Sequence, residues 1–202
     1  MASIYDLKPA FQGLLRPITR ALAGAGVTAN MVTLAAVALS IVVGALIAIF
    51  PTARWPLVLL GPWLFARMAL NAIDGMLARE HGQKSALGGM LNELGDVVAD
   101  TALYLPFACV PGFPPALVVL VVTLAIMTEM AGVVCVQVGA SRRYDGPFGK
   151  SDRAFAFGAL GLALGLGAPT GPWLKWLFAT MAGLSALTIV NRARKGLAEI
   201  RV

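Results

Sequence analysis

Charged residues are scarce in this sequence: Asp, Glu, Lys and Arg make up 13% of its 202 residues, whereas 58% are hydrophobic. Soluble domains contain about 25% charged residues, so this composition excludes an ordinary soluble protein. Apolar runs of about 20 residues recur, and each is long enough to cross a hydrocarbon core of about 30 Å. We therefore expect an integral membrane protein with no room for a sizeable soluble domain.

Cysteine is scarce as well. Cys109 and Cys135 both lie within apolar runs, which is typical of small core residues and gives no reason to expect a disulfide. The first residues lack the basic start and the continuous apolar segment of a secretory signal. The net charge is +6, but Lys and Arg lie beside the apolar runs. There they indicate membrane topology and contact with anionic lipids, not binding to nucleic acid.

Six apolar segments predict six transmembrane helices, and the short connections between them predict antiparallel neighbours. These segments lie near 30–50, 55–78, 87–110, 114–139, 152–168 and 172–192. The predicted fold class is thus an all-α integral membrane protein. We divide it into an interfacial segment at 1–28, a six-helix membrane domain at 29–195 and a tail at 196–202.

The interfacial segment is predicted from its periodicity. Apolar residues recur at helical spacing at Phe11, Leu14, Leu15, Ile18 and Leu22, with basic residues between them. This pattern predicts an N-terminal amphipathic helix in the membrane interface, ahead of the six transmembrane helices.

Basic residues gather at one set of segment ends. They are Lys8, Arg16, Arg20, Arg79, Lys84, Arg142, Arg143, Lys150, Arg153, Arg192, Arg194, Lys195 and Arg201. The opposite ends have only Arg54 and Lys175. Because cytoplasmic loops carry the excess of Lys and Arg, both termini and the loop "AREHGQKSA" are expected to face the cytoplasm.

Residues 71–100 contain five of the ten acidic residues. Asn71 and Asp74 share one helical face in the second apolar segment, and Asn92, Asp96 and Asp100 share one face in the third. An antiparallel hairpin would bring the two faces together. Converging carboxylates repel one another unless a cation lies between them. Their hard oxygen atoms favour Mg²⁺, Mn²⁺ or Ca²⁺ over zinc.

Glycines accompany these acids. Gly75 follows Asp74, and Gly88 lies at the start of the third segment. Glycine destabilises a helix, but it lets a ligand approach the backbone closely. With Arg79 at the rim, this arrangement suits a metal-bound diphosphate. The alternative is that the acids form structural ion pairs with Arg67 and Arg79.

This stretch resembles the CDP-alcohol phosphotransferase (CDP-alcohol phosphatidyltransferase) family, whose pattern is D-x2-D-G-x2-A-R-x8-G-x3-D-x3-D. Six positions of the pattern are kept with every spacing: Asp74, Gly75, Ala78, Arg79, Gly88 and Asp96. The first and third motif aspartates are replaced by Asn71 and Asn92, and a further carboxylate, Asp100, follows one turn later.

The resemblance implies an enzyme of phospholipid synthesis that transfers the phosphatidyl group of CDP-diacylglycerol to an alcohol, releases CMP, and depends on Mg²⁺ or Mn²⁺. In the family register Asp74 is a metal ligand, Asn71 and Asn92 are neutral ligands, and Asp96 is the general base. The two asparagines leave three alternatives: one metal ion, two weakly bound ions, or a site shifted by one turn in which Asp96 ligates and Asp100 is the base. The resemblance implies these nucleotide-binding residues: Asp74, Gly75, Ala78, Arg79 and Gly88.

A second basic cluster lies in "SRRYDGPFGKSDRAF", residues 141–155. Arg143, Lys150 and Arg153 are candidates to bind a phosphate of the acceptor or of the donor lipid, and they favour a phosphate-bearing acceptor. The alternative is a positive loop that binds lipid headgroups. Ser151 or Asp152 is expected to cap the helix that follows.

Glu129 lies in the fourth apolar segment. We expect it to form a structural pair, with Arg67 at a similar depth as the partner, and a substrate contact is the alternative.

The sequence leaves three other functions open. They are transfer from a soluble CDP-alcohol to diacylglycerol, an inactive relative of the family, and a cation transporter. The outer halves of the helices lack the second set of acids that a transport pathway would need. The resemblance also implies a homodimer in a bacterial inner membrane, with the active site on the cytoplasmic side.

Overall fold

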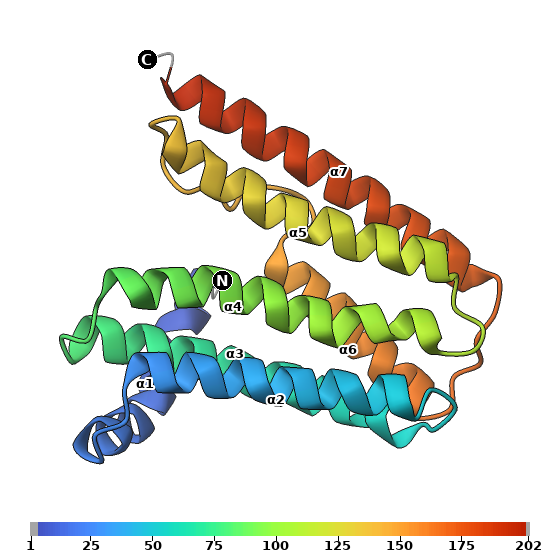
Figure 1. The fold of residues 1–202 in the computed structure, drawn as a ribbon, viewed down its shortest axis with the longest axis horizontal. Coiled ribbons are helices and arrows are strands. Elements are labelled where there is room, and N and C mark those ends of the chain that lie inside the picture. The colour runs from blue at the N-terminus through green and yellow to red at the C-terminus, as the bar shows by residue number, and fades with distance from the viewer. Residues whose placement is uncertain (1–3, 201–202) are drawn as a thin grey trace. The chain divides into compact units, whose positions relative to one another are not determined.

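The computed structural model describes residues 4–200, and all regular secondary structure in that range is helical (Figure 1). Its elements are α1 (Ile4–Gly24), α2 (Ala29–Ile49), α3 (Trp55–Glu80), α4 (Ala86–Tyr104), the 3₁₀ helix η1 (Leu105–Cys109), α5 (Pro115–Gln137), α6 (Lys150–Gly165) and α7 (Trp173–Ile200). The prediction of an all-α fold is confirmed for these residues. Residues 1–3 of the predicted interfacial segment and 201–202 of the predicted tail lie outside the described range.

The third predicted helix is shorter than expected. The α-helix ends at Tyr104, and η1 continues the chain to Cys109. Pro106 explains this end, because proline lacks a backbone N–H and its ring clashes with the preceding helical turn. The last helix, in contrast, continues beyond the predicted end of the sixth segment near 192 to Ile200.

Four helices in the described range are long and apolar enough to cross a membrane, namely α2, α3, α5 and α7. The other two predicted spans differ from them. Helix α4 contains Glu93, Asp96 and Asp100, and α6 has only 16 residues. The apolar helices support an integral membrane protein, while the count of six spans and the interfacial position of α1 stay predictions.

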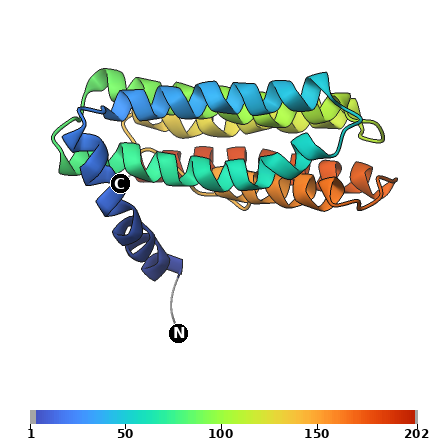
Figure 2. The same cartoon turned by 90° about the horizontal axis from the view of Figure 1, so that it is seen from below.

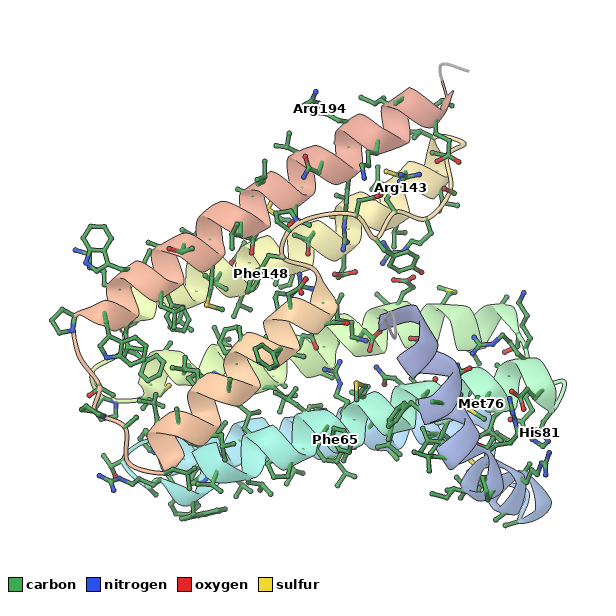
Figure 3. The ribbon with its side chains drawn as sticks, turned by 180° about the vertical axis from the view of Figure 1, so that it is seen from behind. Phe65, Met76, His81, Arg143, Phe148 and Arg194 are labelled. Atoms are coloured by element: carbon green, nitrogen blue, oxygen red, sulfur yellow. The ribbon has the colours of Figure 1, made fainter. Side chains whose placement is uncertain are left out.

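The helices are grouped in two compact units, and each is described by itself. The first unit comprises residues up to 42 together with 62–99. In its core, Leu15 of α1 packs with Val32 of α2 and with Met76 and Leu77 of α3 (Figure 3). Helix α1 runs at a steep angle to α2 (Figure 2). The apolar face of α1 that was predicted from periodicity is therefore partly used for packing within this unit.

The second unit comprises residues 43–61 and those from 100 onward. Helices α5 and α7 run alongside each other in it (Figure 1). Aromatic rings fill its interior: Tyr104 stacks on Phe157 with ring centroids 4.1 Å apart, and Phe157 meets Phe178 edge to face at 5.8 Å. Such ring pairs contribute about 0.5–1.5 kcal/mol beyond the area that they bury.

Close approach of α4 to α2 in the first unit requires a glycine at position 95. A Cβ atom there would lie 2.9 Å from Cγ2 of Val37, whereas a Cβ atom at Gly89 would meet no atom within 4 Å. The two glycines of one helix therefore form a matched pair, one packed against a neighbour and one open.

Gly95→Ala should lower the free energy of unfolding by about 1–3 kcal/mol, because the added methyl group overpacks the contact with Val37. Gly89→Ala should raise it by up to about 1 kcal/mol, because alanine favours helix. Thermal unfolding of both variants in detergent measures the difference. Equal shifts in the two variants would contradict the close approach.

Candidate active site

Asp74 lies on α3 and is 4% exposed. The hydroxyl group of Thr33 on α2 donates to its Oδ2 atom at 2.9 Å. The start of α2 is fixed by two side chains that accept backbone N–H groups of its first turn, the hydroxyl of Thr28 at 3.2 Å and the amide of Gln83 at 2.6 Å. Because these caps hold the first turn of α2, they also fix the position of Thr33 beside the carboxylate.

Asp96 lies on α4 and is half-buried. Its Oδ1 atom accepts hydrogen bonds from Nδ2 of Asn71 and from Nη2 of Arg67, both at 3.2 Å. The side chain of Arg67 is 5% exposed, so this ion pair is shielded from water. Asn71 and Asp96 were predicted to meet across a helical hairpin, and the structure brings them into contact.

Arg67 pairs with Asp96 within the first unit. The expected contact of Arg67 with Glu129, which lies in the second unit, stays a prediction.

The remaining motif residues differ in their surroundings. The guanidinium group of Arg79 lies over Gly75, since a Cβ atom at position 75 would be 3.0 Å from its Nη2 atom. A Cβ atom at Gly88 would be 2.9 Å from Oδ1 of Asn30, so the side chain of Asn30 occupies the space that the glycine provides. Asn92 is exposed on α4. Ala78 packs against the hydrophobic core that α1, α2 and α3 form.

Thr33 and Asn30 are site residues that the sequence analysis missed. Both lie in the segment that enters α2, where the sequence reads "TANMVT". Polar residues in the first two turns of an otherwise apolar helix were the signal that could have identified them.

The oxygen atoms of Asp74, Asn71 and Asp96 are hard donors of the kind that Mg²⁺ and Mn²⁺ prefer. Within residues 4–200, no group of three His, Cys, Asp or Glu side chains could hold a metal ion. A divalent cation at this site would therefore need neutral oxygen atoms in addition to carboxylates.

Asp100 lies on α4 one helical turn after Asp96 and belongs to the second unit. It is 6% exposed, and Nη2 of Arg153 lies 4.0 Å from its Oδ2 atom. Arg153 of α6 is fully buried and donates to Oε1 of Glu129 at 2.7 Å. The sequence analysis assigned separate roles to Arg153 and Glu129, whereas the structure shows that they form an ion pair.

Glu129 of α5 contacts two further arginines. Arg142, from the loop before α6, donates to its Oε2 atom at 3.1 Å, and Arg192 of α7 donates to the same atom at 3.3 Å. We call Glu129, Arg142, Arg153 and Arg192 the Glu129 cluster. Arg192 was predicted only as a marker of topology, so its contact with Glu129 is a finding of the structure.

The other two predicted basic residues lie outside the Glu129 cluster. Arg143 pairs with Asp145 at 2.9 Å and with Glu199 at 2.8 Å, and it lies beside the end of α7 (Figure 3). Lys150 is the first residue of α6 and is half-buried. The N-cap residue of α6 is Gly149, and neither Ser151 nor Asp152 occupies that position, because the helix begins earlier than expected. Asp152 lies in the first turn and its carboxylate accepts the N–H of Gly149 at 2.8 Å.

Asp145 lies in the loop between α5 and α6. Hydrogen bonds from Lys195 and from Arg143 lower the pKa of this carboxyl group below its ordinary value near 3.8. A group with a lowered pKa in the folded state stabilises the fold above its unfolded pKa, and this contribution is lost as the pH falls through the folded pKa.

Asp145→Asn should therefore lower the free energy of unfolding at pH 7. Because the Lys195 side chain is 57% exposed, the loss should stay below about 1 kcal/mol. The difference in the free energy of unfolding between wild type and variant should disappear as the pH falls below about 4. Thermal unfolding across pH 3–7 measures this, and a difference that is as large at pH 3 as at pH 7 would contradict the role of the carboxylate.

Comparison with known proteins places these residues in a wider context. A sequence model of the CDP-alcohol phosphatidyltransferase family matches residues 26–190. The chain is 47% identical over 193 residues to the inner membrane protein YnbA of Escherichia coli (strain K12), covering 95% of each protein. It is 34% identical over 107 residues to a phosphatidylinositol phosphate synthase of Mycolicibacterium smegmatis, covering 52% of this chain and 46% of the synthase.

Solved structures share the fold. The phosphatidylinositol phosphate synthase of Mycobacterium tuberculosis with CDP-DAG bound superposes with a TM-score of 0.75 at 19% identity, covering 89% of this chain and 92% of the synthase. The same enzyme in complex with manganese and citrate gives a TM-score of 0.75 at 19% identity, covering 90% and 88%. At this identity the likeness extends to the fold.

Proposed function

The chain belongs to the CDP-alcohol phosphatidyltransferase family and is a membrane-embedded transferase, and we propose that it transfers the phosphatidyl group of CDP-diacylglycerol to an alcohol and releases CMP. The observation that supports this most directly is the buried Asp74, held by Thr33 within the family's spacing of residues. The complex of a related synthase with CDP-DAG supports the identity of the donor.

Asp74 and Asn71 would hold a divalent cation, Mg²⁺ or Mn²⁺, with Asn92 as a further neutral donor. Bound there, the cation would offset negative charge on the diphosphate of the donor. We propose one ion per chain, since the two asparagines remove two of the family's negative charges. A manganese complex of a related synthase supports this class of ion.

The residues of the chain then have separate tasks. Arg79, whose guanidinium group lies over Gly75, binds the phosphates of the nucleotide. Asp96 accepts the proton of the acceptor hydroxyl, and Asn71 and Arg67 orient its carboxylate. In the shifted register Asp100 accepts this proton.

Of the three basic residues Arg143, Lys150 and Arg153, we propose that Arg143 and Lys150 attract the anionic reactants, either the donor phosphate or an acceptor, whereas Arg153 pairs with Glu129. The basic segment ends support a site and two termini on the cytoplasmic face of a bacterial inner membrane. A homodimer is proposed from the family resemblance.

The proposal predicts metal-dependent release of CMP. Purified protein in liposomes, supplied with CDP-diacylglycerol, Mn²⁺ or Mg²⁺ and a panel of alcohols, should release CMP with at least one acceptor, and a chelator should abolish it. Asp74→Asn should lower the rate by more than about 100-fold, since even outer-shell residues of metal sites contribute 10–100-fold. Thr33 can still donate to the new amide oxygen, so the variant should fold.

Two comparisons complete this experiment. Glu80→Gln, which changes an exposed carboxylate that pairs with Arg16, should keep the wild-type rate. Asp96→Asn that loses activity but still binds Mn²⁺ would identify Asp96 as the base, whereas loss of Mn²⁺ binding in Asp96→Asn together with loss of activity in Asp100→Asn would identify the shifted register. Folded wild-type protein that releases no CMP with any donor or acceptor would contradict the proposed function and favour an inactive relative.

Asn71→Asp should make folding depend on metal. The new carboxylate would lie within about 3 Å of Asp96, since Asn71 already donates to it at 3.2 Å, and like charges at this distance repel. We expect a lower melting temperature than wild type with chelator and a larger stabilisation by Mn²⁺. The matched variant Asn92→Asp, at an exposed position, should change less. Equal stabilisation of wild type and Asn71→Asp by Mn²⁺ would contradict a cation at Asn71.

A further inference from the structure

The Glu129 cluster has the chemistry of a phosphate-binding site, but a carboxylate of the chain already occupies it. Its arginines come from three different segments: the loop before α6, α6 and α7. Several guanidinium groups that converge from different segments are a common way to bind phosphate. Here both carboxylate oxygens of Glu129 accept from them, Oε1 from Arg153 and Oε2 from Arg142 and Arg192.

The arginines are also held by other groups of the second unit. Arg153 donates to the hydroxyl of Thr128 at 2.9 Å and to the carbonyl of Phe148 at 3.3 Å. Arg192 donates to the carbonyl of Asp145 at 3.1 Å and to the carbonyl of Thr128. Both arginines are at most 1% exposed. An incoming phosphate could therefore reach them only by displacing Glu129.

The charges in this region favour the same conclusion. Within the described residues, three positive charges of the cluster face Glu129 and, 4.0 Å from Arg153, Asp100. A buried carboxylate that accepts hydrogen bonds from arginines is costly to remove, because the positive charges of the arginines would then be buried without a negative partner. A dianionic phosphate that entered beside Glu129 would also meet its negative charge.

The cluster lies beside Asp100, the acidic residue of α4 that belongs to the second unit. Arg153 of the cluster is 4.0 Å from its Oδ2 atom. In the shifted register of the proposed reaction, Asp100 is the base that deprotonates the acceptor. The Glu129 cluster is therefore placed to influence which acceptor is used.

We propose that Glu129 is an internal counter-anion that occupies the place of an acceptor phosphate, so that the enzyme selects an alcohol without a phosphate group over the phosphate ester of the same alcohol. This inference rests on the proposed function. The proposal replaces the expectation of a phosphate-bearing acceptor, which rested on the basic cluster in residues 141–155. Arg153 of that cluster is already paired with Glu129. Glu129 would act on specificity through the arginines and would be a positioning residue.

Matched acceptor pairs test the selection. CMP release from CDP-diacylglycerol would be measured with glycerol and glycerol 3-phosphate, inositol and inositol phosphate, and serine and phosphoserine. Wild type should have a kcat/KM at least tenfold higher for the unphosphorylated member of the pair that it uses. Glu129→Gln should lower this ratio at least tenfold, mainly through a lower KM for the phosphate ester. A wild-type preference for the phosphate ester would overturn the proposal.

Binding of inorganic phosphate tests the counter-anion without turnover. Glu129→Gln should melt at a lower temperature than wild type and should be stabilised by millimolar phosphate, because phosphate can then compensate the arginines. Wild type and the matched variant Glu80→Gln should show no such stabilisation. An equal shift in wild type, or no shift in Glu129→Gln, would contradict the proposal.

The two measurements separate the possible failures. If no acceptor supports CMP release, the proposed function fails, while the phosphate measurement still tests the role of Glu129. If Glu129→Gln does not fold even with phosphate, the acceptor preference of wild type decides the matter.

Discussion

Ionisable side chains within apolar helices must find partners inside the protein, and this constraint determines much of the structure. An unpaired charge in or near hydrocarbon costs several kcal/mol. Asp74 is held by Thr33, Asp96 by Arg67 and Asn71, and Glu129 by three arginines. These contacts join α2 to α3, α3 to α4, and α5 to α6 and α7. The polar groups therefore fix the side-chain geometry within each unit as well as providing its chemistry.

The same pairing fits the asparagines that the sequence analysis expects in place of two motif aspartates. In the first unit the amide of Asn71 donates to Asp96, where a second carboxylate would repel it. In the second unit an excess of positive charge is balanced by Glu129 from within the protein. On this account, both changes alter which charged species the enzyme binds: one divalent cation instead of two, and an acceptor without a phosphate group.

The helices could be predicted because their lengths follow from apolar runs and their ends from glycine, proline and charge. The early end of α4 at Tyr104 was also accessible, since Pro106 is visible in the sequence. The contact of Asn71 with Asp96 followed from helical spacing and an antiparallel hairpin. Spacing along one helix thus predicts a shared face well.

Partner choice between helices could not be predicted. The pairing of Arg67 with Asp96 depends on how α3 and α4 are rotated, which depth in the membrane does not determine. Arg192 was interpreted as a marker of membrane topology, because a positive charge at a helix end is explained by topology without an ion-pair partner. In the structure it is buried against Glu129. The space at Gly88 was expected for a ligand, and the side chain of Asn30 lies there.

The most direct test of the account is the number of Mn²⁺ ions that the full-length protein binds. Electron paramagnetic resonance of free Mn²⁺, titrated into purified protein with CDP-diacylglycerol present, gives this number. The account predicts one ion per chain, lost in Asp74→Asn. Two ions per chain of comparable affinity would contradict it, because the charge that remains in the motif would then suffice for the full two-metal site.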